Sequence, residues 1–472
     1  MTAVRVFVLK VSSRLVAAAV VFVAAKVIAK SEYANYAFAL GMFPLLHMVS
    51  TVGSRSSLRR FLPYYGDKVK RTVLIKELIL IFVGLYVVIS MITIPILYFT
   101  DNLLSGQFYY LVAFHILGVA ILVYQISEIM LKSETENFAF FLLGHGIYNL
   151  ARIVLLISIV QNVIQFVYID TILLVLFTVL YFRRYSRKYK IVNARITTKK
   201  LIFSNRFLKY SKFSFFNESG GAILDTGTDL LFLGYFMESV VIADYFIAMK
   251  LCQLLMLLVP VVSLHDYLNT KVFGNYDEQR SDELLYENGS RLALVAVIMS
   301  ALIFMGFWLF GEYFLTLVMP NYSTIYSTIL LMLFFLGMNS IQYACSTIFS
   351  TQKTLRPLLK MRLSSVLNIV LNFILIPLLG IEGAVLSTGF SALLGSLYLV
   401  NSVQNSEFKR VVFQSLFIFI MMTMLPLASS YGLVNISAYL ILCNYLCLGI
   451  IMFTMRSRLI NGISGFVNLL KG

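Results

Sequence analysis

Long apolar stretches recur along almost the whole chain and leave only short polar segments between them. Each stretch has the roughly 20 residues that a helix needs to cross the hydrocarbon core of a membrane, and a helix satisfies its backbone hydrogen bonds internally there. Of the 472 residues, 60% are hydrophobic and 13% are charged. This pattern predicts an all-α fold, a polytopic membrane helix bundle.

We expect about fourteen transmembrane helices in this bundle. The candidate spans are residues 11–29, 36–53, 77–99, 109–131, 139–159, 163–182, 213–233, 241–264, 292–310, 327–349, 360–379, 384–402, 413–428 and 437–455. They predict an N-terminal six-helix lobe at 1–190, a basic connector at 191–212, a C-terminal six-helix lobe at 213–402, and a hairpin with an amphipathic tail at 403–472.

The distribution of positive charge predicts the orientation of these spans. Most of the 38 Lys and Arg residues, which give a formal net charge of +16, fall in alternate loops, with the densest run at 183–212. Because basic loops stay on the cytoplasmic side, both termini are expected there. The charge therefore reports topology and does not indicate a nucleic-acid partner. The basic, partly apolar connector is suited to the surface of anionic membrane lipids.

A few basic residues depart from this pattern. Lys26, Arg152 and Lys250 lie inside predicted spans, Arg14 lies near the inner end of the first span, and Lys30 lies in an outer loop. A charged side chain at mid-bilayer costs roughly 2.5–3.5 kcal/mol, so such residues face a bundle interior or a wet cavity.

Two interpretations of these cations remain open. In the first, Arg14, Lys26, Arg152 and Lys250 contact an anionic substrate, because guanidinium and ammonium groups bind phosphate or acidic sugar oxygens. In the second, Arg152 and Lys250 pair with Glu128, Asp225 or Asp229 and only hold the bundle together.

Acidic residues form one stripe on the predicted helix at 213–233. Ser214, Glu218, Gly221, Asp225 and Asp229 recur at spacings of three or four residues, which places them on one helical face. Ion or proton coupling at Asp225 and Asp229 is one hypothesis, since a buried carboxylate beside a like charge binds protons and cations readily. A fixed internal salt bridge is the rival hypothesis.

Three further spans carry polar faces. His145, Asn149 and Arg152 share a face of span 139–159. Uncharged stripes follow two later spans and comprise Asn339, Gln342 and Ser346, then Ser365, Asn368 and Asn372. Together these stripes predict a central polar cavity between the two lobes.

Features of an enzyme or of an ATP-driven pump are missing from the sequence. No Gly-rich phosphate loop followed by Lys-Ser or Lys-Thr occurs, and no two of the four histidines have metal-ligand spacing. The four cysteines lie in apolar segments without paired spacing. We therefore expect no catalytic residues, no metal, no cofactor and no disulfide.

An internal repeat supports two lobes. Ala34-Asn35-Tyr36 aligns with Ala243-Asp244-Tyr245, and each segment precedes a span that contains a proline, Pro44 or Pro260. Proline in a membrane helix predicts a kink. Parallel repeats of six helices are typical of transporters.

Three stretches resemble the polysaccharide-transporter branch of the multidrug/oligosaccharidyl-lipid/polysaccharide (MOP) exporter superfamily, which contains the Wzx-type O-antigen flippases. The first runs from Arg14 through Glu32–Ala37 to Val52-Gly53 and Arg60-Phe61-Leu62-Pro63. The second comprises Asp229–Gly234 and Tyr245–Leu251, and the third comprises Leu367–Asn372, Ile376-Pro377 and Gly380–Ala384. Ala34 and Ala243 depart from the family pattern, which usually has glycine before the tyrosine.

The resemblance implies an alternating-access flippase of the bacterial inner membrane. It implies an undecaprenyl-pyrophosphate-linked oligosaccharide as substrate, for O-antigen, capsule or exopolysaccharide assembly, with Arg14, Asp229, Lys250, Asn368 and Asn372 at the cavity. The expected partners are membrane lipids and the polymerase and chain-length regulator of such a system. A cation-coupled multidrug exporter, a lipid II flippase and a non-transporting scaffold remain the alternatives.

Overall fold

The protein is a helical, multi-pass membrane protein. The computed structural model describes residues 3–54, 58, 68–100, 108–132, 135–188, 205–224, 226–265, 272, 281–352, 354 and 356–432, and among these no strand occurs. Ten helical segments of the described chain are long and apolar enough to cross a membrane. The predicted polytopic helix bundle is confirmed.

The chain divides into two compact units, described separately below. One comprises Ser12–Phe246 and is called the N-terminal unit; the other comprises Met1–Val11 with Ile247–Gly472 and is called the C-terminal unit. The boundaries predicted for the lobes, 1–190 and 213–402, stay predictions.

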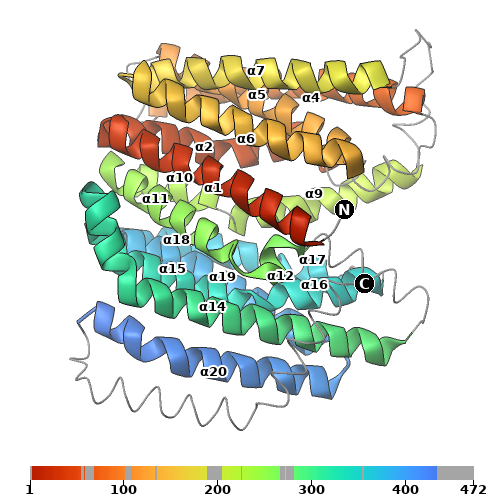
Figure 1. Cartoon of the computed structure of the whole chain (residues 1–472), viewed down its shortest axis with the longest axis vertical. Coiled ribbons are helices and arrows are strands. Elements are labelled where there is room, and N and C mark those ends of the chain that lie inside the picture. Colours follow the sequence, from red (N-terminus) through yellow and green to blue (C-terminus); the bar gives the residue numbers. More distant parts are fainter. Residues whose placement is uncertain are drawn as a thin grey trace. The chain divides into compact units, whose positions relative to one another are not determined.

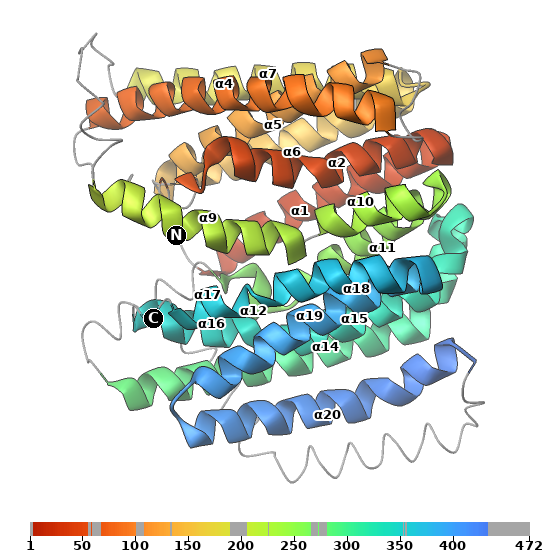
Figure 2. The same cartoon turned by 180° about the vertical axis from the view of Figure 1, so that it is seen from behind.

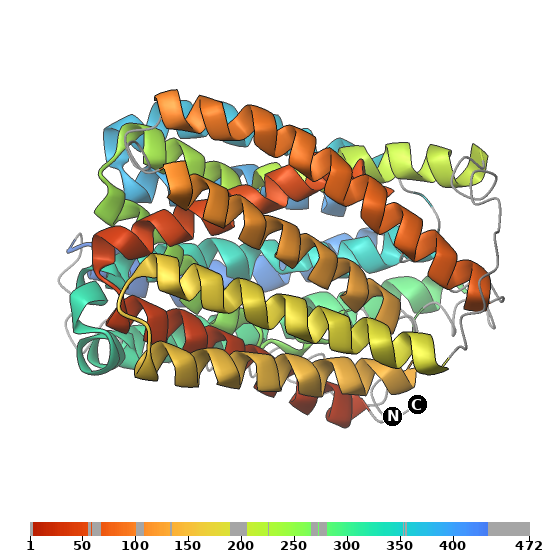
Figure 3. The same cartoon turned by 90° about the horizontal axis from the view of Figure 1, so that it is seen from above.

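The N-terminal unit is built of long helices that pack side by side (Figure 1). They are α1 (Ala3–Val27, entering from the other unit), α2 (Lys30–Thr51), α4 (Lys68–Thr100), α5 (Phe108–Lys132), α6 (Thr135–Ser158), α7 (Val163–Lys188), α9 (Asn205–Leu224), α10 (Thr226–Phe236) and the start of α11 (Ser239–Met256). Helix α5 packs against α4, α6 and α7, and α2 packs against α4, α9 and α10. In Figure 3, α4, α5, α7 and α6 follow one another across the face of this unit.

The C-terminal unit holds the rest of α11 and a second set of helices, seen from behind in Figure 2. They are α12 (Pro260–Ser263), α14 (Asp282–Val318), the 3₁₀ turn η2 (Pro320–Ile325), α15 (Tyr326–Asn339), α16 (Ile341–Thr351), α17 (Arg356–Met361), α18 (Ser364–Leu379), α19 (Ile381–Ser402) and α20 (Ser406–Ser430). Helix α14 packs against α15, α16 and α20, and α19 packs against α18 and α15.

The turn between α18 and α19 requires glycine at two positions. Gly380 has a φ of +60°, which L side chains rarely adopt. A Cβ atom at Gly383 would meet the backbone of the preceding helix, with Ile376 N at 2.9 Å. The two glycines thus allow α19 to fold back directly onto α18.

The two prolines of the repeat act differently. Pro44 lies inside the continuous helix α2. Helix α11, by contrast, ends at Met256, and Pro260 begins the short helix α12. Proline is favoured at a helix start because its missing N–H is not needed there. The predicted span 241–264 is therefore interrupted, and a kink in one helix is the wrong description of it.

The predicted spans from 11–29 to 413–428 each overlap described helices, and several helices extend six to ten residues beyond the prediction, as α14 does for 292–310. The predicted span 327–349 falls on α15 and α16, and 360–379 falls on α17 and α18. The predicted span 213–233 falls on α9 and α10, which lie on either side of Asp225. Residue 225, the span at 437–455, the tail beyond it, and the connector up to residue 204 lie outside the described residues. The count of fourteen spans therefore stays a prediction.

Candidate functional site

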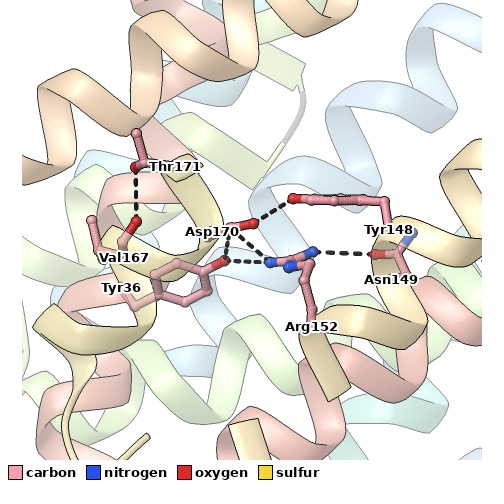
Figure 4. Close-up of polar contacts among 7 residues, drawn as sticks. All are labelled: Tyr36, Tyr148, Asn149, Arg152, Val167, Asp170 and Thr171. Carbon is pink, nitrogen blue, oxygen red and sulfur yellow. Dashed lines mark hydrogen bonds and ion pairs between the residues drawn. The ribbon is translucent and has the colours of Figure 1, made fainter. Parts of the chain in front are cut away.

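A buried ion pair joins two neighbouring helices of the N-terminal unit (Figure 4). Arg152 Nη2 on α6 lies 2.8 Å from Asp170 Oδ2 on α7, and the side chains are 13% and 3% exposed. A charge in this environment is tolerated only when it is paired and hydrogen-bonded. The pair therefore neutralises two ions that neither lipid nor the apolar interior would accept alone.

Two tyrosines complete the shell around Asp170. Tyr36 of α2 donates to Asp170 Oδ2 at 3.4 Å and accepts from Arg152 Nη2 at 3.1 Å, while Tyr148 of α6 donates to Asp170 Oδ1. The Asp170 carboxylate of α7 thus accepts from three donors on two other helices, α2 and α6. The cluster connects α2, α6 and α7 through hydrogen bonds and one ion pair.

The guanidinium of Arg152 is enclosed on its other sides as well. Its Nη1 donates to Asn149 Oδ1 at 3.2 Å, and its Cζ lies 5.2 Å and 5.3 Å from the ring centres of Tyr148 and Phe166. Cation–π contacts of this kind stabilise a desolvated Arg. Of the two interpretations of Arg152, the geometry favours internal pairing. The partner is Asp170, however, and not Glu128, Asp225 or Asp229.

The predicted polar face of α6 continues along the same helix. His145 Nδ1 lies 2.8 Å from the hydroxyl of Tyr124 on α5, and Asn149 Nδ2 donates to the His145 carbonyl at 2.8 Å. The predicted stripe of His145, Asn149 and Arg152 therefore points at the neighbouring helices of its own unit.

A second buried aspartate lies near the start of α10. Asp229 is fully buried and accepts a hydrogen bond from the Tyr245 hydroxyl on α11. Its predicted companion, Asp225, lies outside the described residues.

The cations of α1 are in a different situation from Arg152. Arg14 and Lys26 are exposed, and neither forms a hydrogen bond or ion pair within the described part of the chain. Lys30, at the start of α2, pairs with Asp244 of α11 at 2.7 Å. Arg14 and Lys26 are therefore available to a ligand, while Lys30 is neutralised locally.

The remaining predicted site residues belong to the C-terminal unit. Lys250 is half-buried, and its Nζ lies 3.4 Å from Gln253 Oε1 one turn further along α11. Asn368 and Asn372 on α18 are fully buried, and Asn368 Oδ1 accepts from the Thr388 hydroxyl of α19 at 3.0 Å. The structure thus places Arg14, Lys26, Arg152 and Asp229 in one unit and Lys250, Asn368 and Asn372 in the other.

The other uncharged stripe also meets neighbouring helices. Asn339 Oδ1 accepts from Ser396 of α19 at 3.3 Å, and the Ser346 hydroxyl lies 3.1 Å from His265 Nε2. These polar faces serve helix packing within the C-terminal unit.

Comparisons with known proteins support the fold. No protein-family model and no curated protein matches the sequence. Among solved structures, the chain resembles the lipid II flippase MurJ in an inward closed conformation, with a TM-score of 0.68 and 17% identity over 96% of this chain and 99% of that one. It also resembles an inward-facing multidrug resistance MATE family transporter of the MOP superfamily, with a TM-score of 0.58 and 13% identity over 90% and 96% of the chains.

A third similar structure is a MOP-superfamily transporter from Pyrococcus furiosus Vc1, described as having a binding pocket of reversed polarity. The TM-score is 0.55, with 14% identity over 89% of this chain and 96% of that one. The chain has the fold of the MOP superfamily.

Within the MOP fold, the internal repeat has a structural counterpart. Tyr36 and Tyr245, which align in the sequence repeat, each donate to a buried aspartate, Asp170 or Asp229. The residues Ala34 and Ala243, which stand where the family pattern has glycine, are both fully buried. Ala34 lies in α2 and Ala243 in α11, so the protein encloses each small side chain completely.

Sequence reasoning missed two residues of this MOP-type fold. Asp170 is the one carboxylate in the apolar run of α7, and an intramembrane acid of that kind is itself a signal. Glu32 accepts from the backbone N–H of Val163 at 2.9 Å and so caps the start of α7. No sequence signal links Glu32 to a position 131 residues later.

Proposed function

We propose that the protein is a flippase that moves an undecaprenyl-pyrophosphate-linked oligosaccharide from the cytoplasmic to the outer leaflet of a bacterial inner membrane by alternating access. Both chain termini would lie in the cytoplasm. The fold likeness to the lipid II flippase MurJ over nearly the full length of both chains supports this class of substrate.

The observation that carries the proposal is the availability of Arg14 and Lys26. Both are exposed on α1 and neither has a partner in the described part of the chain. Lys26 follows Arg14 by twelve positions, which is about 18 Å along the helix. By the predicted topology α1 crosses the membrane, and free cations on such a helix must face water or an anion, because facing lipid is costly. A pyrophosphate group supplies the opposite charge, and because it is much shorter than this separation it would contact the two residues in turn as it crosses the membrane.

The other predicted residues take secondary roles in this mechanism. Lys250 adds a third cation, and Asn368 and Asn372 supply amide groups for sugar or phosphate oxygens. Asp229, with Asp225, is the candidate for ion coupling. Arg152 is held by Asp170 and would act by bracing the N-terminal unit.

Replacing the free cations tests the proposal. In a bacterium that lacks its own polysaccharide flippase but makes the lipid-linked oligosaccharide, we expect Arg14→Gln and Lys26→Gln each to lower surface polysaccharide about tenfold or more, the factor of a lost charge-assisted hydrogen bond. Lipid-linked oligosaccharide that has not been flipped should accumulate in the cytoplasmic leaflet of the membrane. Arg14→Lys and Lys26→Arg should retain most activity.

Arg410→Gln is the matched control, since Arg410 is also exposed and has no partner among the described residues. Membrane levels of every variant are measured by quantitative immunoblot. Wild-type polysaccharide in the double variant Arg14→Gln, Lys26→Gln at normal membrane level would contradict the proposal.

A lipid II flippase is the second candidate, favoured by the same structural neighbour. It predicts rescue of growth in cells depleted of MurJ. A multidrug exporter, suggested by the MATE neighbours, predicts drug resistance on overexpression. Two exposed cations on α1 disfavour a cationic drug, because like charges repel.

A further inference from the structure

An apolar groove of about 700 Å³ runs along the surface of the N-terminal unit between α4, α5 and α7. These three helices lie side by side in Figure 3. The lining side chains include Leu80 of α4, Ile116 and Ala120 of α5, and Val175, Val179 and Phe182 of α7. The groove lies wholly within one unit and is remote in sequence from Arg14 and Lys26.

The walls of the groove present carbon atoms. Leu80, Ile116 and Val175 are 73%, 52% and 50% exposed. The two lining threonines hide their hydroxyls, because Thr171 donates to the Val167 carbonyl at 2.7 Å (Figure 4) and the Thr178 oxygen is buried. The lining residues therefore present an apolar surface to any ligand in the groove.

The length of the groove matches one leaflet. On α7 it extends from Thr171 to Phe182, which is about 16 Å of helix. This is roughly half of the ~30 Å hydrocarbon core. Thr171 lies near the middle of the span Val163–Arg184 and Phe182 near its end. The groove therefore accepts a chain that enters from one membrane surface and stops near the midplane.

A cation lies at the end of the groove that is near the membrane surface. Arg183 directly follows Phe182, is exposed, and has no partner in the described part of the chain. The next residue, Arg184, is engaged, since its Cζ lies 3.9 Å from the ring centre of Phe140. Arg183 is thus the free charge at the groove mouth.

From this juxtaposition we infer that the groove is a binding site for an anionic phospholipid, with one acyl chain between α4, α5 and α7 and the phosphate at Arg183. By the predicted topology this end of α7 faces the cytoplasm, where the leaflet is rich in anionic lipids. The inference is independent of the transported substrate.

Quenching of tryptophan by brominated lipid tests the site on the full chain. Trp308 is the one tryptophan, and Trp308→Phe gives a silent background. Val175→Trp and, separately, Ile116→Trp place the reporter on two walls of the groove. Leu150→Trp on α6 is the control, because Leu150 is 53% exposed and lies outside the groove. Its depth in the membrane matches that of Val175: Leu150 lies ten residues from the span end at Phe140, and Val175 lies nine residues from the span end at Arg184.

Each variant is reconstituted in phosphatidylcholine vesicles, and phosphatidylglycerol or phosphatidylcholine with dibrominated acyl chains is titrated in. We expect both groove reporters to be quenched by the anionic lipid at about fivefold lower mole fraction than by phosphatidylcholine, the factor for one cation near an anionic headgroup. The Leu150→Trp reporter should show no preference. Arg183→Gln should remove the preference from the groove reporters.

Three results would overturn the inference. Equal quenching by both lipids at both groove positions would do so, as would a preference that survives Arg183→Gln. Displacement of brominated phosphatidylglycerol by a much lower mole fraction of undecaprenyl phosphate would assign the groove to a polyprenyl chain instead.

Discussion

Arg152 and Asp170 form a 2.8 Å ion pair between α6 and α7, and the same carboxylate holds the hydroxyls of Tyr36 and Tyr148. The pair lies inside one compact unit. A pair so enclosed cannot exchange one partner for a substrate phosphate without leaving a buried carboxylate uncompensated.

Arg152→Met should therefore destabilise the protein. Breaking a buried pair from one side costs about 3–5 kcal/mol, whereas replacing both partners by apolar residues is often neutral. We expect a lower melting temperature in detergent for Arg152→Met and recovery of most of it in Arg152→Met with Asp170→Leu. Arg410→Gln serves as the exposed control. A double variant as unstable as the single one would argue against the pairing role.

Tyr245→Phe tests whether Asp229 couples transport to an ion. The change removes a hydrogen bond to a charged group, worth about 1.5–3 kcal/mol, and leaves the carboxylate less well held. The cation concentration for half-maximal transport should shift in Tyr245→Phe. Tyr36→Phe is the matched control, because it removes the equivalent contact to Asp170. An equal shift of this cation concentration in the two variants would contradict a role of Asp229 in ion coupling.

Gly227→Ala should weaken the packing of α2 against α10. A Cβ atom at Gly227 would contact the carbonyl oxygen of Gly41, and backbone cannot yield as a side chain can. Overpacking of this kind costs about 1–3 kcal/mol, and small residues are what allow membrane helices to approach closely. The melting temperature should fall.

The control for Gly227→Ala is Gly84→Ala on α4, where nothing lies within 4 Å of the added Cβ. That change should be neutral or stabilise by about 0.5–1 kcal/mol. A similar fall in melting temperature in both variants would mean that helix propensity or expression, and not the contact between α2 and α10, causes the fall.

Glu32→Ala should loosen the start of α7. Glu32 Oε2 accepts from Val163 N at 2.9 Å, and a lost helix cap costs about 1 kcal/mol. Amide hydrogen exchange at Val163 and the next residues is the measurement, and faster exchange is expected. Glu32→Gln keeps an acceptor and should exchange nearly as the wild type does. Unchanged exchange in Glu32→Ala would contradict the capping role.

The sequence was sufficient to predict where the helices lie, but not where each helix begins and ends. Apolar runs of about 20 residues predict spans reliably, because few other structures satisfy the backbone in lipid. The break between Met256 and Pro260 was not predicted, since proline is compatible both with a kink and with a new helix start.

The site was predicted in part. Helical phase correctly grouped His145, Asn149 and Arg152, because spacings of three and four define one face. It could not identify Asp170 as the partner, since which face of α7 meets α6 depends on tertiary packing. The roles predicted for Arg14, Lys26 and Lys250 stay predictions, because they depend on a ligand.

Helix α14 has 37 residues and so is about 55 Å long, well beyond the ~30 Å of a hydrocarbon core. About 25 Å of the helix, summed over its two ends, must therefore project into water or headgroups. Its first turn carries Asp282 and Glu283, capped by the Ser281 side chain. An anionic bilayer surface would repel that acidic first turn, so the N-terminal end of α14 should point away from the lipid.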